Sequence, residues 1–533
     1  MIRLKFLIFI GLVTLVSGFS LLTLGSTPLS AQENAPTIDY VGADECADCH
    51  RDIARRHDDS FHVLTLQDDD AAILADFGQG ESLREVTFPG DDAPRAFDEG
   101  DIAFTVGTGQ YVQRYLYEVD RNDYRVLPAE WDVVAAEWRP LQLADAWEDP
   151  AYDWEQSCAY CHTTGLDLER ERWEDDGVQC ETCHGPGEDH AELARDVGRR
   201  PSDEELTEVR TAINSGVDPQ VCGQCHSRGV STDGRPYPTG YYPGADLSQY
   251  FTLVQPDQAD HWWSTGHARL SYMQYNEWVA SDHASSLTEV LDSEDADDSC
   301  LTCHSADSTY IAQLAAEFEA GDRESAPPSA PTTETAQYGI TCISCHNPHV
   351  ENELPANLVQ ETYALCISCH SNSTIPEGMH HPVQEMWEGL AVIDQVSPEQ
   401  GVHYLAENGP TCITCHAASV PVEAGQRVSH TLAPIMPGAA LSEAVLEDSC
   451  SSCHDEVASP QLMQALIDDI QANTQQRIDT ARAAITETTS EWVRLALDFV
   501  EGDGSLGIHN YTYSDAMLDA VYEELNLFAL ADQ

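Results

Sequence analysis

This sequence has almost no lysine, and it has no cysteine outside one repeated pattern. Lys5 is the single lysine, so every permanent positive charge beyond it is an arginine. All 18 cysteines occur in Cys-x-x-Cys pairs, which leaves none for a lone catalytic thiol or a separate disulfide. After the first 24 residues no apolar run reaches the length of about 20 residues that a membrane-spanning helix needs.

A histidine directly follows each of the nine Cys-x-x-Cys pairs. In c-type haem attachment the two thiols bind one porphyrin, and the adjacent histidine binds its iron. Zinc sites and redox dithiols also use Cys-x-x-Cys, but they have no need of that histidine. The pattern therefore predicts nine covalently bound haem c groups, numbered here 1 to 9 in the chain order of their motifs.

Every residue of these motifs that contacts a haem can be assigned from the spacing. The predicted attachment residues are Cys46, Cys49, Cys158, Cys161, Cys180, Cys183, Cys222, Cys225, Cys300, Cys303, Cys342, Cys345, Cys366, Cys369, Cys412, Cys415, Cys450 and Cys453. The predicted proximal iron ligands are His50, His162, His184, His226, His304, His346, His370, His416 and His454.

The second axial ligand decides whether an iron only carries electrons or has a position free for substrate. Twelve of the 21 histidines lie outside the motifs, and three sets of them are close neighbours: His57 with His62, His261 with His267, and His380 with His381. Counting each set once gives nine positions for nine irons. The predicted distal ligands are His62, His190, His267, His283, His349, His381, His403, His430 and His509.

Local patterns rank these candidates. His62, His267 and His283 each have a Ser or Thr two residues before them. His190 and His349 follow their own motifs so closely that we expect each to bind the iron of a different haem. Such exchange of ligands would clamp the haems into a stack.

The N-terminus has the pattern of a secretory signal. Arg3 and Lys5 precede an apolar run over residues 6–24, and small residues lead to a cleavage site after Ala31. Residues 1–31 are therefore predicted to be a signal peptide of a periplasmic, extracellular or cell-surface protein. The alternative is an uncleaved membrane anchor, since 19 apolar residues can span a bilayer.

The remaining chain is strongly acidic. Ninety-two acids against 25 bases give a formal charge of −67. Such a surface excludes nucleic acid and favours basic redox proteins, metal cations or another extracellular electron acceptor as partners. Membrane contact is expected only if the N-terminal segment is retained. Adaptation to a salty medium explains the same charge without any partner.

We expect a mainly α and irregular multihaem cytochrome fold, in which stacked haems form much of the core. Alternating residues near 101–138 predict a small β insertion, and helical periodicity from residue 459 predicts a C-terminal helical hairpin. The expected segments are 32–145 with haem 1 and the β insertion, 146–290 with haems 2–4 and distal-ligand helices, 291–458 with haems 5–9, and 459–533.

Several stretches resemble known multihaem c-type cytochromes. VGADECADCHRDIARRHDDSFH and CETCHGPGEDH are similar to segments of tetrahaem cytochromes associated with ammonia oxidation. QYNEWVASDH and GIHNYTYSDAMLDAVYEEL resemble helices of the octahaem oxidoreductase and pentahaem nitrite reductase lineage. The resemblance implies that His62, His190, His283 and His509 are distal ligands. It also marks a departure, because the lysine that binds the catalytic iron in those reductases has no counterpart beyond Lys5.

Two functions follow. The favoured hypothesis is a nine-haem electron carrier with every iron six-coordinate and low-spin. The alternative is an oxidoreductase that acts on a small nitrogen or sulfur compound at one open haem, with His57, His261 or His380 in its distal pocket.

Overall fold

The computed structural model describes residues 39–528, except 199–200, 322–325, 351–353, 373–379, 391–392, 394, 407–408, 424 and 441–444. The predicted signal peptide lies outside the described residues. In the part of the chain that is described, no helix is both long and apolar enough to cross a membrane. Tyr40–Gln533 clusters as one unit, and the finer division into four segments stays a prediction.

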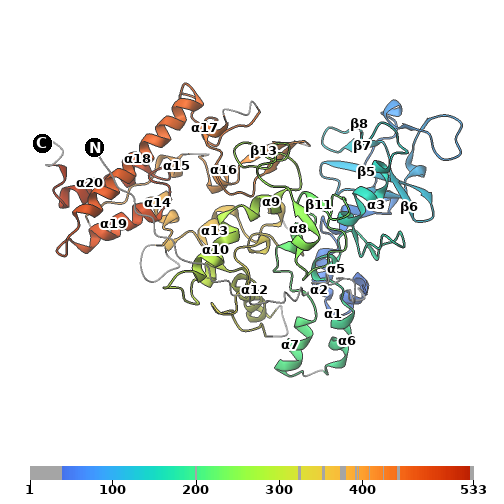
Figure 1. Cartoon of the computed structure of the whole chain (residues 1–533), viewed down its shortest axis with the longest axis horizontal. Helices are drawn as coiled ribbons and strands as arrows, with labels where there is room; N and C mark the ends of the chain where they lie inside the picture. The colour runs from blue at the N-terminus through green and yellow to red at the C-terminus, as the bar shows by residue number, and fades with distance from the viewer. Residues whose placement is uncertain are drawn as a thin grey trace, which may run out of the picture. The chain divides into compact units, whose positions relative to one another are not determined.

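A sheet occupies the region where alternation predicted β structure (Figure 1). Its strands are β1 (Leu66–Gln67), β4 (Phe104–Val106), β5 (Val112–Asp120), β6 (Asp123–Val126), β7 (Ala129–Asp132) and β8 (Glu137–Pro140). Their order is β1-β4-β5-β7-β8, with β6 also paired to β5.

The central strand β5 is buried on both faces. The adjacent residues Tyr115 and Leu116 of this strand are both fully buried. Since successive side chains of a strand point to opposite faces, both faces are covered. Leu116 packs with Trp154 in one apolar cluster, and Tyr115 packs with Phe97 in another. The cluster around Trp154 also contacts Cys158, so the sheet rests directly against motif 2.

The C-terminal region forms three helices where a hairpin was predicted. They are α18 (Pro460–Ala484), α19 (Glu491–Gly502) and α20 (Tyr511–Glu524). Ser459 caps α18 by accepting from the amide of Leu462, and the Thr-rich stretch 485–490 separates α18 from α19.

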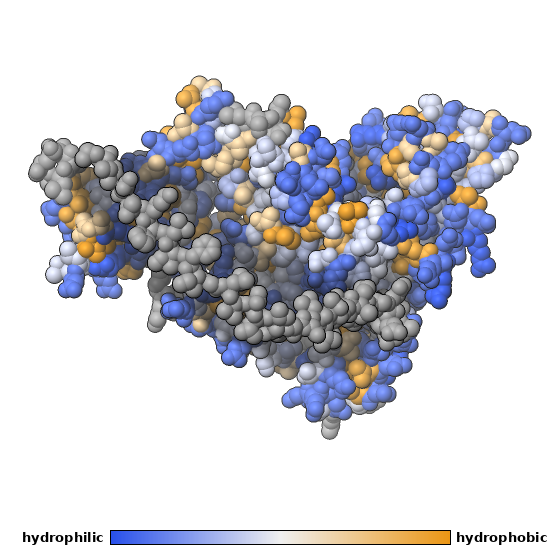
Figure 2. All heavy atoms as spheres, viewed as in Figure 1, coloured by the Kyte–Doolittle hydropathy of each residue, from blue (hydrophilic) through white to orange (hydrophobic). Residues whose placement is uncertain are grey.

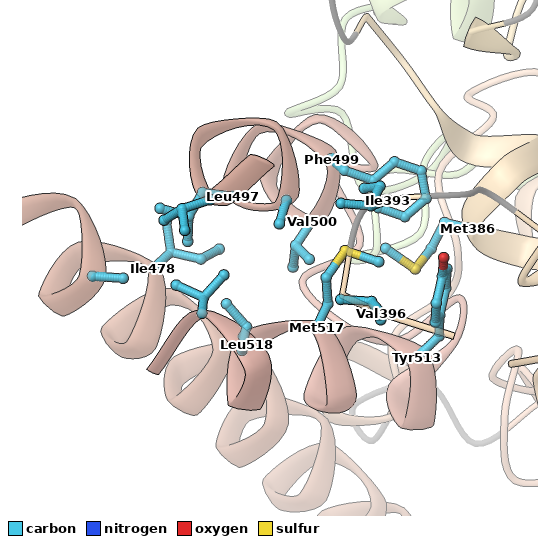
Figure 3. Packing of buried hydrophobic residues seen from close by; sticks show 14 of the residues in the cluster. Met386, Ile393, Val396, Ile478, Leu497, Phe499, Val500, Tyr513, Met517 and Leu518 are labelled. Carbon is cyan, nitrogen blue, oxygen red and sulfur yellow. The ribbon is translucent and has the colours of Figure 1, made fainter. Parts of the chain in front are cut away.

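These helices enclose a conventional apolar core (Figure 3). Ile478 from α18, Leu497 and Val500 from α19, and Met517 and Leu518 from α20 are each at most 1% exposed. Met386, Ile393 and Val396 from the preceding motif-bearing segment pack into the same cluster (Figure 3).

Outside the sheet and these helices, the described chain consists of short elements and loops. The helices are α1 (Ala43–Cys49), α2 (Arg51–His57), α3 (Trp154–Ser157), α4 (Ala159–His162), α5 (Cys180–His184), α6 (Glu188–Asp196), α7 (Asp203–Thr211), α8 (Gln220–Gly223), α9 (Gln274–Val279), α10 (Asp282–Leu291), α11 (Leu301–His304), α12 (Ala306–Ala320), α13 (Thr362–Ile367), α14 (Val383–Glu388), α15 (Val402–Leu405), α16 (Cys412–His416) and α17 (Pro437–Ala440). Two-stranded pairs are formed by β2 (Glu85–Val86) with β3 (Arg95–Ala96), β9 (Thr163–Thr164) with β10 (Asp175–Asp176), β11 (Gly229–Ser231) with β12 (Phe251–Leu253), and β13 (Ser419–Val422) with β14 (Gly425–Val428).

The surface is mostly hydrophilic on the face shown in Figure 2, with scattered apolar residues. This agrees with the acidic composition of the chain.

Candidate haem-binding interior

One connected cavity of about 3060 Å³ runs through the described chain, and residues from all nine motifs line it. A site for one drug-sized ligand usually measures about 300–1,000 Å³. The lining is mainly apolar side chains with many imidazoles and thiols. Both the size and the donor set fit several haems in contact and do not fit a single small ligand.

Each motif forms a tight helical turn that collects its haem-binding atoms. The amide of the histidine donates to the carbonyl of the first cysteine, as in His50 to Cys46 at 2.9 Å and His226 to Cys222 at 2.9 Å. Residues three and four apart lie on one face of a helix. The turn therefore presents both thiols and the imidazole to the same side, as one porphyrin requires.

Eight of the motif histidines face a second histidine ring at nearly constant separation. A metal–imidazole bond is about 2 Å long, so two imidazoles on one metal have ring centroids about 6 Å apart. The facing pairs are His50 with His190 at 6.3 Å, His184 with His349 at 5.9 Å, His226 with His62 at 6.3 Å, His304 with His380 at 5.9 Å or His381 at 6.3 Å, His346 with His430 at 6.2 Å, His370 with His283 at 6.1 Å, His416 with His509 at 6.1 Å and His454 with His403 at 6.0 Å.

The outer nitrogen of many of these rings is held by the protein. The Nδ1 acceptors are the carbonyls of Asn214 for His184 (2.7 Å), Val209 for His190 (2.9 Å), Ala356 for His346 (2.7 Å), Leu432 for His416 (3.0 Å) and Val428 for His430 (3.2 Å), and the carboxylate of Asp503 for His509 (2.6 Å). Metal-binding histidines use their second nitrogen in this way, which fixes the ring and leaves Nε2 for the metal.

Burial favours the neutral imidazole, the form that binds iron, at His62 and His430, whereas the hydrogen bond to Asp503 outweighs burial and raises the pKa of His509. Burial and the neighbouring rings His226, His57 and His349 lower the pKa of His62 to about 4. Burial and the nearby His346 lower the pKa of His430 to about 4 as well.

His267 is placed differently from the other predicted distal ligands. It is 1% exposed, yet its Nδ1 hydrogen-bonds with Thr265 Oγ1 at 2.9 Å and its Nε2 donates to the carbonyl of Ala433 at 3.1 Å. It does not line the cavity. The structure therefore gives no support to His267 as an iron ligand, because both of its nitrogens are used within the protein.

The histidines that sequence ranking set aside have separate roles. His57 hydrogen-bonds with the carbonyl of Val178 at 3.1 Å and with Ser60 Oγ at 3.2 Å, so it too is occupied. His261 does not line the cavity. His380 and His381 both face His304, with ring centroids 4.2 Å from each other, and His381 also faces His370 at 6.2 Å, so His381 has the spacing of a ligand toward two motif histidines.

Motif 2 lacks the facing ring that the other motifs have. Within the described ranges, the ring neighbour of His162 is Trp154, with centroids 5.7 Å apart, and no second imidazole stands opposite it. His162 Nδ1 hydrogen-bonds with Thr65 Oγ1 at 2.6 Å. Thr65 directly precedes β1, so the sheet determines how this ring is held.

A cation from the sheet lies near the same motif. Arg114 on β5 lines the cavity. Burial lowers the pKa of His162, and the charge of Arg114 lowers it further. Burial raises the pKa of the Cys158 thiol, and Arg114 partly opposes this rise. Its guanidinium also donates to Glu130 on β7 at 2.9 Å. The pocket beside motif 2 thus combines apolar walls with one arginine.

Thiols of different motifs approach one another, which shows which motifs are neighbours in space. Thiols of different motifs lie close enough to shift each other's pKa in five pairs: Cys46 with Cys180, Cys161 with Cys225, Cys222 with Cys342, Cys303 with Cys369, and Cys366 with Cys412. Weaker electrostatic contacts join Cys183 to Cys225, Cys345 to Cys369, and Cys415 to Cys453.

Comparison with known proteins agrees with this interior. The family description "Doubled CXXCH motif" matches residues 335–374, and "Cytochrome c554 and c-prime" matches residues 136–185. No curated protein sequence matches the chain.

Solved structures of multihaem cytochromes share the fold, among them the following two. The outer cell wall cytochrome OcwA is 28% identical, with a TM-score of 0.72, and the match covers 91% of this chain and 99% of that chain. The undecahaem cytochrome from the S-layer of Carboxydothermus ferrireducens is 19% identical, with a TM-score of 0.55, and the match covers 93% and 70% of the two chains. The predicted resemblance to multihaem c-type cytochromes is confirmed, and the motifs support covalent c-type haem.

Proposed function

We propose that the protein is a nine-haem c-type cytochrome that transfers electrons along a branched line of haems outside the cytoplasmic membrane. The observation that carries this proposal is the set of eight facing imidazole pairs with the spacing of ligands on one iron. An iron with two histidine ligands has no position for substrate and serves electron transfer.

The proposed exchange of ligands accounts for the two histidines, His349 and His190, that closely follow a motif. His346 would bind haem 6 while His349, three residues later, binds haem 3 opposite His184. Likewise His190 follows motif 3 but would bind haem 1 opposite His50. One short segment then holds two haems, which fixes their separation.

The thiol contacts support an order of transfer. They support a main line through haems 1, 3, 4, 6, 7, 8 and 9, with haem 2 as a branch from haem 4 and haem 5 as a branch from haem 7. The two ends of this line carry the exposed attachment thiols, Cys49 and Cys453, whereas the other attachment thiols are half-buried. Electrons would enter and leave there.

The proposed location and partners rest on the relatives and on charge. OcwA is an outer cell wall cytochrome, and the other neighbour is from an S-layer. With the predicted signal peptide and a formal charge of −67, an exported protein that exchanges electrons with basic redox proteins or a cationic acceptor fits best.

The proposed path is tested by interrupting the main line at haem 6. A photoreductant attached at Asp455→Cys, close to haem 9, would inject electrons at one end of the line. Removing haem 6 with Cys342→Ser and Cys345→Ser should confine rapid reduction to haems 5, 7, 8 and 9. Removing haem 2 with Cys158→Ser and Cys161→Ser is the matched control and should leave transfer to haem 1 intact. Equally fast reduction of haem 1 without haem 6 would contradict the path.

A second function is favoured by the environment of His162: reduction of a small anionic nitrogen or sulfur compound at haem 2. A c-type haem with one histidine ligand supplies an open iron position and electrons. Arg114 would attract the anion.

A half-buried carboxyl group also lies close to motif 2 along the chain, although it does not itself line the cavity. Glu155 is three residues before Cys158, and burial, with the nearby Asp123, Glu171 and Asp153, raises its pKa to about 7. Its Oε1 is buried without a hydrogen-bond partner in the described residues. A carboxyl group with this pKa can donate a proton near neutral pH. Reoxidation of the reduced protein by nitrite or sulfite, compared with the variant Glu155→Gln, tests this activity.

A further inference from the structure

Glu181 occupies a variable position inside motif 3, yet its side chain is among the most buried charged groups, 1% exposed. Oε1 accepts from the amides of Val41 at 3.0 Å and Gly187 at 2.7 Å. Oε2 accepts from the amides of Val41 at 3.1 Å and Gly42 at 2.8 Å. Every contact comes from a donor, the pattern that suits an ionised carboxylate.

These bonds connect motif 3 to both sides of the haem 1 site. Val41 and Gly42 lead directly into α1, which carries motif 1. Gly187 caps α6, which carries His190, and His190 stacks opposite His50. A Cβ at position 187 would lie 3.2 Å from Glu181 Oε1, so the glycine allows this close approach.

The charge of Glu181 is not neutralised by a basic side chain in the described ranges; no ion pair there involves it. Its field reaches the surrounding groups: burial and then Glu181 raise the pKa of Tyr40 to about 12. It also acts on the thiols Cys46 and Cys180, which attach haems 1 and 3. A fixed negative charge beside a haem stabilises the oxidised, more positive iron and so lowers its reduction potential.

We propose that Glu181 is a positioning residue that fixes both iron ligands of haem 1 against motif 3 and holds haems 1 and 3 at low potential. The proposal rests on the proposed ligation of haem 1 by His50 and His190. Haem 1 ends the main line, so its potential determines the direction in which electrons cross that end of the protein.

The test is a haem-resolved redox titration of the full holoprotein, followed by EPR and NMR. Glu181→Gln removes the charge and keeps the size, and the potentials of haems 1 and 3 should rise while the other seven stay unchanged. Glu277→Gln is the matched control: this buried carboxylate accepts from the amide of His430 at 2.7 Å and from Ala268 at 2.7 Å, so its effect should appear at haem 6. A Glu181→Gln titration that superimposes on that of the wild type, or a uniform shift of all nine haems, would overturn the proposal.

Two further variants keep the outcome decisive. Glu181→Asp keeps the charge but cannot span the same distance, so it should leave the potentials near wild type and change the low-spin EPR signal of haem 1; an unchanged signal counts against positioning. His190→Ala should turn haem 1 high-spin. If haem 1 stays low-spin in His190→Ala, the proposed ligation of haem 1 is wrong. If haem 1 becomes high-spin but Glu181→Gln changes no potential, the ligation stands and only the role proposed for Glu181 is wrong.

Discussion

Motifs 2 and 3 have the same five-residue pattern, but the protein surrounds their histidines differently. His184 in motif 3 faces the parallel ring of His349, with an angle of 5° between the planes. His162 in motif 2 is packed against Trp154, with Arg114 nearby and no facing imidazole among the described residues. The attachment motif is therefore encoded locally, whereas the group that faces its histidine depends on which distant segment packs there. Motif 3 is covered by a segment from motif 6, and motif 2 by the sheet.

The largest effect is expected where a facing histidine is removed. His349→Ala should give motif 3 the coordination proposed for motif 2, so the oxidised protein should contain two high-spin haems in place of one. His267→Ala is the control, because both nitrogens of His267 bond to the protein. Quantitative EPR of both variants decides: a new high-spin signal in His267→Ala, or none in His349→Ala, would reverse the ligand assignment.

A smaller effect is expected from the arginine beside motif 2. Arg114→Gln should weaken binding of nitrite or azide to haem 2 about tenfold, equivalent to about 1.4 kcal/mol, because one charge-assisted contact is lost. Arg139→Gln provides the comparison, since Arg139 pairs with Asp132 and does not line the cavity. Optical anion titrations measure both. Equal anion affinities in the two variants would show that Arg114 does not contribute to anion binding at haem 2.

A third change tests how the outer nitrogen tunes a six-coordinate haem. Asp503 is 4% exposed and accepts from His509 Nδ1 at 2.6 Å, whereas the other acceptors described above are backbone carbonyls. A carboxylate partner makes the imidazole a stronger donor and favours oxidised iron. Asp503→Asn should raise the potential of haem 8 alone, as followed by redox titration. An unshifted haem 8 would show that this bond does not tune it.

The smallest effect concerns Thr65. Thr65→Val removes the hydrogen bond to His162 Nδ1, an interaction of about 1 kcal/mol. We expect haem 2 to remain high-spin with a slightly higher potential and slightly broader EPR lines. Conversion of haem 2 to low-spin in this variant would mean that another residue can reach its iron.

The sequence predicted the attachment chemistry more completely than the coordination. The nine motifs were visible because thioether attachment needs a fixed local spacing, and the β region near 101–138 was visible through its alternation. The choice of His267 depended on a local pattern shared with His62 and His283, but tertiary packing directs its Nε2 to the carbonyl of Ala433. The contacts of Glu181 and Arg114 had no signal in the sequence, because they join segments far apart in the chain. The C-terminal periodicity indicated helices but not the break at 485–490.

The most direct test of the account is the spin state of the nine irons in the wild-type protein. Low-temperature EPR of the oxidised protein, with carbon monoxide titration of the reduced protein, counts haems that have a free position. We predict eight low-spin haems and one high-spin haem, and rapid binding of one carbon monoxide per chain that is lost together with haem 2 in Cys158→Ser, Cys161→Ser. Nine low-spin haems without carbon monoxide binding, or binding that persists in the variant without haem 2, would contradict the account.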